Sequence, residues 1–274
     1  MNCFLNFKEY EDIDDVNEVS WDIWEKKAKD INKILDDIYI SRKRIADGKK
    51  QIIPVRDSLL VPLLYGRKFK PGNILFVGMN PSFNVKGFEK IIKTQLPNSV
   101  RGDIKYSEIM LKEFYNWDNR ARFSREVAID IENEARNVYD EYFKKFKEIS
   151  EFVFGNNEKW EHIDLFFIRM TSQTGVLEIM KKDKEFEKMQ LEASLSLIKL
   201  AKPSVIVVAN AGAVAKISEY CLLSEERNDC DYRFLHIPGA ENIPVFTVSM
   251  LTGQRALDKG SLHILKRCIK RAIG

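Results

Sequence analysis

The sequence predicts an α/β fold, a three-layer sandwich in which a central four-stranded parallel sheet lies between two layers of helices. Four short segments have the composition of strands, and most are apolar without interruption, as in parallel strands covered on both faces. Segments with helical periodicity separate them, and this alternation predicts right-handed crossovers. The predicted strands are residues 74–78, 163–169, 205–209 and 244–249.

The first 65 residues are expected to form an N-terminal helical extension. Within it, residues 21–47 carry apolar side chains at steps of three or four, the spacing of one helix face. Asp22 and Glu25 stand in the first turn, where negative charge suits the helix dipole. We expect the apolar face to pack on the core; it consists of Trp21, Trp24, Ala28, Ile31, Leu35 and Ile38.

Further helices are expected between and after the strands. Residues 86–150 are predicted to be a helical insertion, because the segment from 104 onward is charged and helical in period. A later helix ends before Pro203, since the residue that precedes a proline disfavours helical backbone. The other predicted helices are residues 186–201, 211–223 and 261–273.

Length and composition are those of a folded protein with one core. The chain has 274 residues, of which 45% are hydrophobic and 31% are charged, so we expect a single domain over residues 1–274. The 44 basic and 41 acidic residues leave a net charge of +3, which neither requires nor excludes nucleic acid as a partner.

Patterns that the sequence lacks lead to expectations about the cell compartment and about metal binding. No apolar run approaches the roughly 20 residues that cross a bilayer, and the N-terminus has no signal-peptide pattern. Four scattered cysteines without a CxxC pair suggest reduced thiols, so we expect a cytoplasmic protein without membrane contact. Three histidines without ligand spacing predict no metal site.

The position of a functional site follows from the predicted sheet. Ligands of parallel sheets bind beyond the carboxyl ends of the strands. The candidate site therefore consists of residues 80–88, 169–173, 210–212 and 249–255. Neither GxGxxG nor GxxxxGK[ST] follows any predicted strand, so the sequence lacks a glycine-rich phosphate loop.

Three segments resemble the uracil-DNA glycosylase superfamily. In its mismatch-specific and single-strand-selective branches, a strand runs into Gly-x-Asn-Pro and a small residue, and here "ILFVGMNPS" ends in Gly78-Met79-Asn80-Pro81-Ser82. "KPSVIVVANAGAVAKI" is similar to the third strand and the helix after it. "IPVFTVSM" enters a loop and a terminal helix, as the second active-site motif does. The resemblance covers roughly residues 70–84, 160–175 and 200–270.

The resemblance implies a DNA glycosylase that hydrolyses the bond between deoxyribose and a flipped-out uracil-like or modified pyrimidine base. Asn80 would position the attacking water through its side-chain carbonyl, which is a weak proton acceptor. Pro81 favours extended backbone at Asn80, and Gly78 lets the chain pass close to a substrate. No cofactor is expected. Because no motif places a lysine as a Schiff-base nucleophile, we expect a monofunctional enzyme.

The same resemblance assigns residues that would bind the base and the DNA. An aromatic residue after the first motif stacks on the base, and either Phe83 or Phe88 fits. The superfamily reads the base with an Asn near the end of its second strand. Here Asp164 stands early in the predicted strand, so Arg169 or Gln173 takes that role. The remaining assignments are Gly78 and Met79 for the base, and Ser82, Leu251 and Thr252 for the DNA.

The second active-site motif differs from the superfamily. The stretch "VSMLTGQRAL" contains neither His-Pro-Ser nor Asn-Pro-Ser. Ser249 and Arg255 are the candidates for the missing catalytic group, and Leu251 is the candidate wedge. His236 lies upstream of the last strand and is expected away from the site.

The predicted insertion interleaves basic and aromatic side chains. Such a mixture suits phosphate contacts and base stacking, and it equally suits the solvated face of a helix. If it is functional, it would adapt the pocket to a base larger than uracil. The residues concerned are Lys105, Tyr106, Tyr115, Trp117, Arg120 and Arg122.

Three functions therefore remain open from the sequence. The first is the glycosylase, a monomer acting on single- or double-stranded DNA. The second is a non-catalytic nucleic-acid-binding protein with a glycosylase fold, which the divergent second motif favours. The third is an unrelated α/β nucleotide-binding or transferase domain, which the absence of a phosphate loop disfavours.

Overall fold

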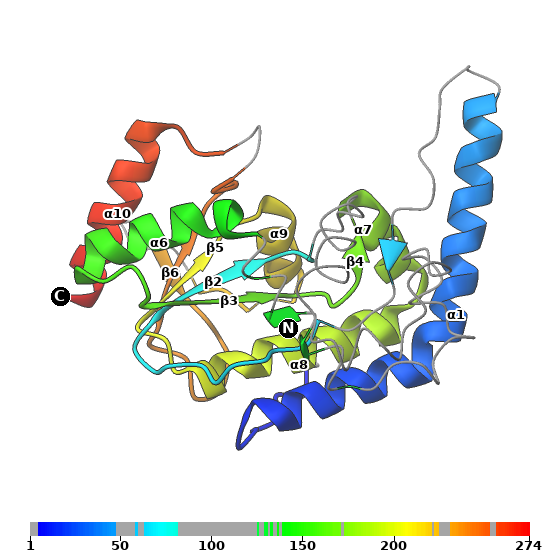
Figure 1. The fold of residues 1–274 in the computed structure, drawn as a ribbon, viewed down its shortest axis with the longest axis horizontal. Helices are drawn as coiled ribbons and strands as arrows, with labels where there is room; N and C mark the ends of the chain where they lie inside the picture. The colour runs from blue at the N-terminus through cyan, green and yellow to red at the C-terminus, as the bar shows by residue number, and fades with distance from the viewer. Residues whose placement is uncertain are drawn as a thin grey trace.

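The protein is an α/β fold with a five-stranded, mostly parallel sheet flanked by helices (Figure 1). The structure is a computed structural model. It describes residues 5–47, 58–59, 63–81, 125, 129–130, 132–133, 136, 139–170, 173–220, 222–224, 231–252 and 256–274. No helix among these residues is both long and apolar enough to cross a membrane.

Four strands of the sheet run parallel, as the sequence predicts, and a fifth strand is added at one edge. The spatial order is β3-β2-β5-β7-β6, and only β6 runs antiparallel, paired with β7. The predicted four-stranded sheet is corrected on this point: "YRF" is too short and too polar to be recognised as a strand. The bounds are β2 (Ile74–Gly78), β3 (Trp160–Asp164), β5 (Val205–Val208), β6 (Tyr232–Phe234) and β7 (Pro244–Thr247).

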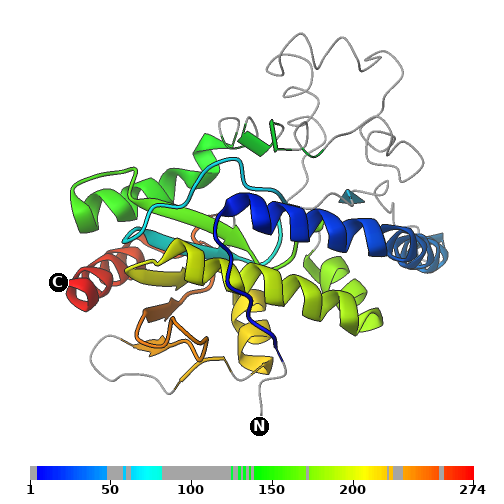
Figure 2. The same cartoon turned by 90° about the horizontal axis from the view of Figure 1, so that it is seen from below.

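Helices cover both faces of the sheet, an arrangement compatible with a three-layer sandwich (Figure 2). Alternation along β2 sends Ile74 and Phe76 to one face and Leu75 and Val77 to the other. On the first face Phe76 stacks on Phe146 at 4.2 Å between ring centroids. That face is covered by α6 (Asp140–Phe154) and α10 (Lys259–Ile273).

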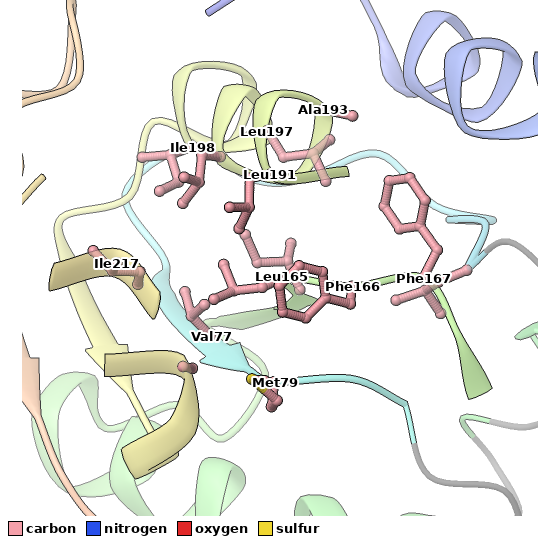
Figure 3. Packing of buried hydrophobic residues seen from close by; sticks show 14 of the residues in the cluster. Val77, Met79, Leu165, Phe166, Phe167, Leu191, Ala193, Leu197, Ile198 and Ile217 are labelled. Atoms are coloured by element: carbon pink, nitrogen blue, oxygen red, sulfur yellow. The ribbon is translucent and has the colours of Figure 1, made fainter. Parts of the chain in front are cut away.

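The opposite face carries the larger core. Val77 and Met79 pack there beneath Leu191 and Ile198 (Figure 3). Both strand and helix contribute aliphatic side chains that are fully buried, which is the main stabilising contribution of such a layer. The helices on this face are α1 (Ile13–Asp47), α7 (Gln173–Lys182), α8 (Lys184–Ala201) and α9 (Ala211–Glu219).

The N-terminal helix α1 starts earlier than predicted and lies alongside α8 (Figure 2). Its buried face is offset from the predicted one, with Trp21 and Trp24 half-buried at its border. Asn17 is buried and exchanges two hydrogen bonds with the Tyr65 backbone, Nδ2 to O at 2.9 Å and N to Oδ1 at 2.8 Å. The helix is thus tied to the segment that leads into β2. Its buried apolar residues are Ile13, Val16, Ile23 and Ile31.

Strand β3 starts three residues before the predicted start and ends five residues before the predicted end. The apolar run at 165–168 is a buried loop, and buried apolar composition alone does not distinguish such a loop from a strand. Two buried side chains of α8 satisfy its backbone. Gln190 Oε1 accepts from Phe167 N at 2.8 Å, and Ser194 Oγ donates to Leu165 O at 3.0 Å.

Two further elements precede and follow the sheet strands. The short strands β1 (Ser58–Leu59) and β4 (Arg169–Met170) pair antiparallel, separate from the main sheet. Residues 140–150 of the predicted insertion belong to α6 and pack on the sheet, since Phe146 and Ile149 are buried in its core. The basic and aromatic residues of the insertion between 105 and 122 lie outside the described residues.

Candidate functional site

A cavity of about 340 Å³ lies at the carboxyl ends of the parallel strands. Gly78, Asp164, Asn210 and Met250 line it from the ends of β2, β3, β5 and β7. Two segments outside the sheet form most of the remaining wall. We call residues 63–69 the first arm, and the second arm consists of the lining residues Glu132, Asn133, Arg136, Tyr139, Tyr142, Phe143 and Phe146. The volume is within the range of small-molecule sites.

The Asn80 side chain is held in one orientation beside this cavity. Its Nδ2 donates to the backbone oxygens of Pro81 at 3.1 Å, Ile168 at 3.3 Å and Met170 at 2.8 Å. Three carbonyl acceptors around one end of the amide identify that end as the NH2 group. Oδ1 is buried and accepts no hydrogen bond from any described residue. Asn80 therefore has a fixed side chain at the edge of the cavity, and its buried Oδ1 has no hydrogen-bond donor among the described residues.

Gly78 is required by the carboxylate of Asp164 next to it. The two residues are register partners in the β2–β3 ladder. A Cβ atom on Gly78 would overlap Asp164 Oδ1 and would lie 3.2 Å from His162 Nε2. Asp164 is only 4% exposed and is the last residue of β3, so the expectation that it stands early in its strand is wrong. The error follows from the misplaced strand boundary.

His162, on the same face of β3, is a neutral histidine. Burial, together with the positive charge of Arg136, lowers its pKa from 6.5 to about 3. Its Nε2 lies 3.8 Å from Asp164 Oδ1, which is longer than a hydrogen bond, and an uncharged ring forms no ion pair. Tyr142 lines the same cavity; its side chain is 42% exposed, but desolvation of the hydroxyl and the negative charge of Asp164 raise the pKa of that hydroxyl.

The two arms bring two arginines to the cavity. Arg67 belongs to the first arm, and its Nη2 donates to Glu161 Oε2 at 2.8 Å and to Trp160 O at 3.1 Å. Arg136 belongs to the second arm, and its Cζ lies 4.3 Å from the centre of the Trp160 ring. Burial and the neighbouring Arg67 lower the pKa of Arg136 from 12.5 to about 10, so it remains charged at neutral pH.

Six of the residues that the sequence predicts for the site line the cavity together. They come from the end of β2, the start of α7 and the turn after β7, which the chain separates by long distances. Met79 contributes to the lining although its side chain is 1% exposed in the core. The six are Gly78, Met79, Asn80, Gln173, Leu251 and Thr252.

The other predicted site residues are not placed in the cavity. Ser249 is exposed and is not among the residues that line it. Arg169 is described in strand β4 by its backbone alone. His236 is exposed and away from the cavity, as expected. The predicted roles of Ser82, Phe83, Phe88 and Arg255 fall on residues outside those the structure describes.

Sequence reasoning missed the titratable residues of the cavity. Asp164 and His162 had a weak signal, because polar and apolar residues do not alternate in "WEHID" and the register opposite Gly78 is seen only in the fold. Arg67, Arg136 and Tyr142 had none, since they reach the cavity only through the packing of the two arms. Asn210 lines the cavity but caps α9, its Oδ1 accepting from the backbone of the first turn.

No family model, curated protein or solved structure matches the chain. Among the described residues, no group of three histidine, cysteine, aspartate or glutamate side chains is arranged to hold a metal ion.

Proposed function

We propose that the protein is a monofunctional DNA glycosylase that hydrolyses the N-glycosidic bond of a flipped-out uracil-like or modified pyrimidine base. The observation that carries the proposal is the amide of Asn80, a residue that lines the cavity: its NH2 group is held by three carbonyls, and its buried Oδ1 has no hydrogen-bond donor among the described residues. The parallel sheet, and the Gly-x-Asn-Pro sequence at the end of its strand β2, support a uracil-DNA glycosylase-like fold.

In this proposal Asn80 and Asp164 divide the handling of the attacking water. Asn80 Oδ1 accepts a hydrogen bond from the water and aims its oxygen at the sugar carbon. The carbon–nitrogen bond breaks and its electron pair leaves with the base, while the water oxygen bonds to the carbon. Asp164 accepts the proton that the water releases, a role for which an amide is too weakly basic. The departing base finally takes up one proton.

Asp164 also suits the charge that develops during the reaction. The sugar becomes positive as the base departs, and a carboxylate fixed nearby stabilises that charge without reorganising. The carboxylate is fixed because it lies over the Cα atom of Gly78, a position that no other residue type leaves open. Its effect is strengthened by burial, since water screens a 4% exposed group weakly.

The walls of the cavity suit a base that has left its stack. Tyr65, Phe69, Tyr142 and Phe143 line it and offer ring faces and edges to a planar ligand. The volume of about 340 Å³ equals that of roughly eleven water molecules at ~30 Å³ each. This is more room than one pyrimidine ring fills, which supports a base that carries a substituent.

A cleavage assay tests the proposal. Oligonucleotides that carry uracil, a mismatched thymine or a bulky modified cytosine are incubated with the protein, and abasic sites are then cleaved with alkali. We expect strand scission by the wild type and its loss in Asn80→Ala. The matched control is Asn156→Ala, because Asn156 lies in an exposed turn where its Oδ1 accepts from Glu158 N at 2.8 Å. Equal scission by both variants would contradict the role of Asn80.

A second candidate is a non-catalytic nucleic-acid-binding protein of the same fold. The observation that favours it is the exposed position of Ser249: among the described residues of the turn after β7, Thr252 is the polar side chain that lines the cavity. Salt-sensitive DNA binding without scission of any substrate would select this candidate. A protein that binds no DNA under low-salt conditions would be neither.

A further inference from the structure

The two arginines of the cavity are neighbours on one aromatic ring. The Cζ atoms of Arg67 and Arg136 lie 5.7 Å and 4.3 Å from the centre of the Trp160 ring. They are therefore no farther apart than the sum of these two distances. Arg136 shows the effect of this proximity: burial is the largest cause that lowers the pKa of its guanidinium group, and the positive charge of Arg67 is the second. Two like charges are thus held together in a partly buried wall.

The acids nearby do not neutralise both charges. Glu161 is 2% exposed and pairs with Arg67. Its Oε1 is used by Asn73 Nδ2 at 3.0 Å and Lys70 N at 3.2 Å. Arg136 forms no ion pair with any described residue. Glu161 and Glu158 attract Arg136 only at longer range, so neither forms a direct ion pair with its guanidinium group.

Two hydrogen-bond donors of the pair also lack acceptors. Arg67 Nε and Arg136 Nη2 are buried and donate to no described residue. A buried charged donor without an acceptor destabilises a fold, so such groups are uncommon unless a ligand or ion completes them. Both residues line the cavity, so a ligand bound there would lie beside the two guanidinium groups.

The arms that carry the arginines are pressed together. A Cβ atom on Gly66 would overlap the side-chain amide of Asn133. Gly66 directly precedes Arg67, and Asn133 lies three residues before Arg136, about one helical turn away. This contact places the segments that carry the two arginines side by side.

We propose that Arg67 and Arg136 form an oxyanion subsite that binds a phosphate or carboxylate group at one end of the cavity. Trp160 and Asp164 are the first and last residues of β3, so the subsite lies about 13 Å along the strand from the Asp164 end. Guanidinium groups recognise both anions through paired N–H donors. The subsite does not depend on bond cleavage at Asn80. In the glycosylase, its ligand would be a strand phosphate or an acidic substituent of the base.

Thermal unfolding in different salts tests the subsite. Sodium phosphate is compared with sodium chloride at equal ionic strength, with Arg136→Gln as the variant. We expect phosphate to raise the Tm of the wild type by a few °C and to leave Arg136→Gln unchanged. In chloride the variant should be at least as stable as the wild type, because it removes a partly buried charge that forms no direct ion pair with a described residue. The control is Lys144→Gln, an exposed cation of α6 that should keep the phosphate response.

The outcomes distinguish the sources of the anion. If Arg136→Gln weakens binding of every single-stranded oligonucleotide and lowers the salt slope by about one, the ligand is a strand phosphate. If it weakens only an oligonucleotide with a carboxyl-substituted pyrimidine, the ligand belongs to the base. If neither changes while the phosphate response is lost, the ligand is a free anion. A phosphate response that is absent in the wild type, or unchanged in Arg136→Gln, overturns the proposal.

Discussion

The strand ends that meet at the cavity differ in the polar side chains that they hold in fixed positions. At the ends of β2 and β3, Asn80 is held by three carbonyls and Asp164 lies over Gly78. At the end of β7, Ser249 is exposed, and the turn contributes the buried Leu251 and the half-buried Thr252. Among the residues that the structure describes, polar groups fixed in position are therefore concentrated on the β2–β3 side of the cavity.

The difference indicates that the catalytic groups proposed for a cleft at a sheet edge can all come from one side of that cleft. In the proposed reaction, the β2–β3 side handles both the water and the developing charge. The β7 side then serves as a wall that shapes the cavity. Substitutions on the first side should change rate and stability strongly, and those on the second side should change them little.

The largest effect is expected for Asp164→Asn, which keeps shape and removes the proton acceptor. The cleavage rate at saturating substrate should fall about 10²-fold or more, the usual contribution of a general base, while DNA affinity is retained. The exposed Asp140 of α6 provides the control substitution Asp140→Asn. An unchanged rate in Asp164→Asn, beside a loss in Asn80→Ala, would assign the proton to another acceptor.

A smaller effect, on folding, is expected for Gly78→Ala. The added methyl group would overlap Asp164 Oδ1, so the strand pair must shift and the free energy of unfolding should fall by about 1–3 kcal/mol. Urea unfolding measures it. In an Asp164→Ala background the same substitution should cost less, because the overlapping atom is gone. Equal costs in both backgrounds would show that the carboxylate is not the reason for the glycine.

The pH dependence of stability is expected to depend on His162, and the exposed His263 serves as the control. The pKa of His162 is about 3 in the folded protein against 6.5 ordinarily, so between these values the unfolded chain binds the extra proton. Stability is therefore complete above about pH 6.5 and falls as the pH is lowered, by at most about 1.4 kcal/mol per pH unit from this group. Urea unfolding at pH 7 and pH 5 should show a weaker decline in His162→Phe. The decline should persist in His263→Phe, since His263 is exposed.

The smallest effects are expected on the β7 side. Ser249→Ala should leave the cleavage rate unchanged and the free energy of unfolding within about 0.5 kcal/mol, as for other exposed positions. Thr252→Ala removes a hydroxyl group from the cavity and should weaken DNA binding by about 2- to 10-fold, the usual contribution of one hydrogen bond. A rate loss in Ser249→Ala comparable to that of Asp164→Asn would overturn the asymmetry between the two sides.

Local patterns in the sequence predicted the parts of the fold that local patterns determine. The run "ILFVG" gives β2 with its observed bounds, because continuous apolar residues before a Gly-x-Asn-Pro turn fit a buried strand. The end of β3 was missed since the loop after it is equally apolar and is satisfied by Gln190 and Ser194 of α8. Such compensation depends on tertiary packing, and no window of the sequence contains it.

The same distinction applies to the cavity. Asn80 was found because its turn is local, but its orientation depends on the carbonyls of Ile168 and Met170, which are distant in sequence. Arg67 stands in a segment without a clear period, and the helical period around Arg136 does not show which part of the fold that helix meets. The two arginines become neighbours only in the folded chain, where both lie against the Trp160 ring.

One wall of the cavity consists of strand ends, and the other consists of the two arms. We expect the wall of strand ends to tolerate fewer substitutions than the wall of arms. Residues of a buried parallel sheet are constrained by neighbours on both faces, whereas segments outside the sheet accept substitution and insertion more readily. A lineage that kept Asn80 and Asp164 while altering the two arms would acquire a new ligand and inherit the old reaction.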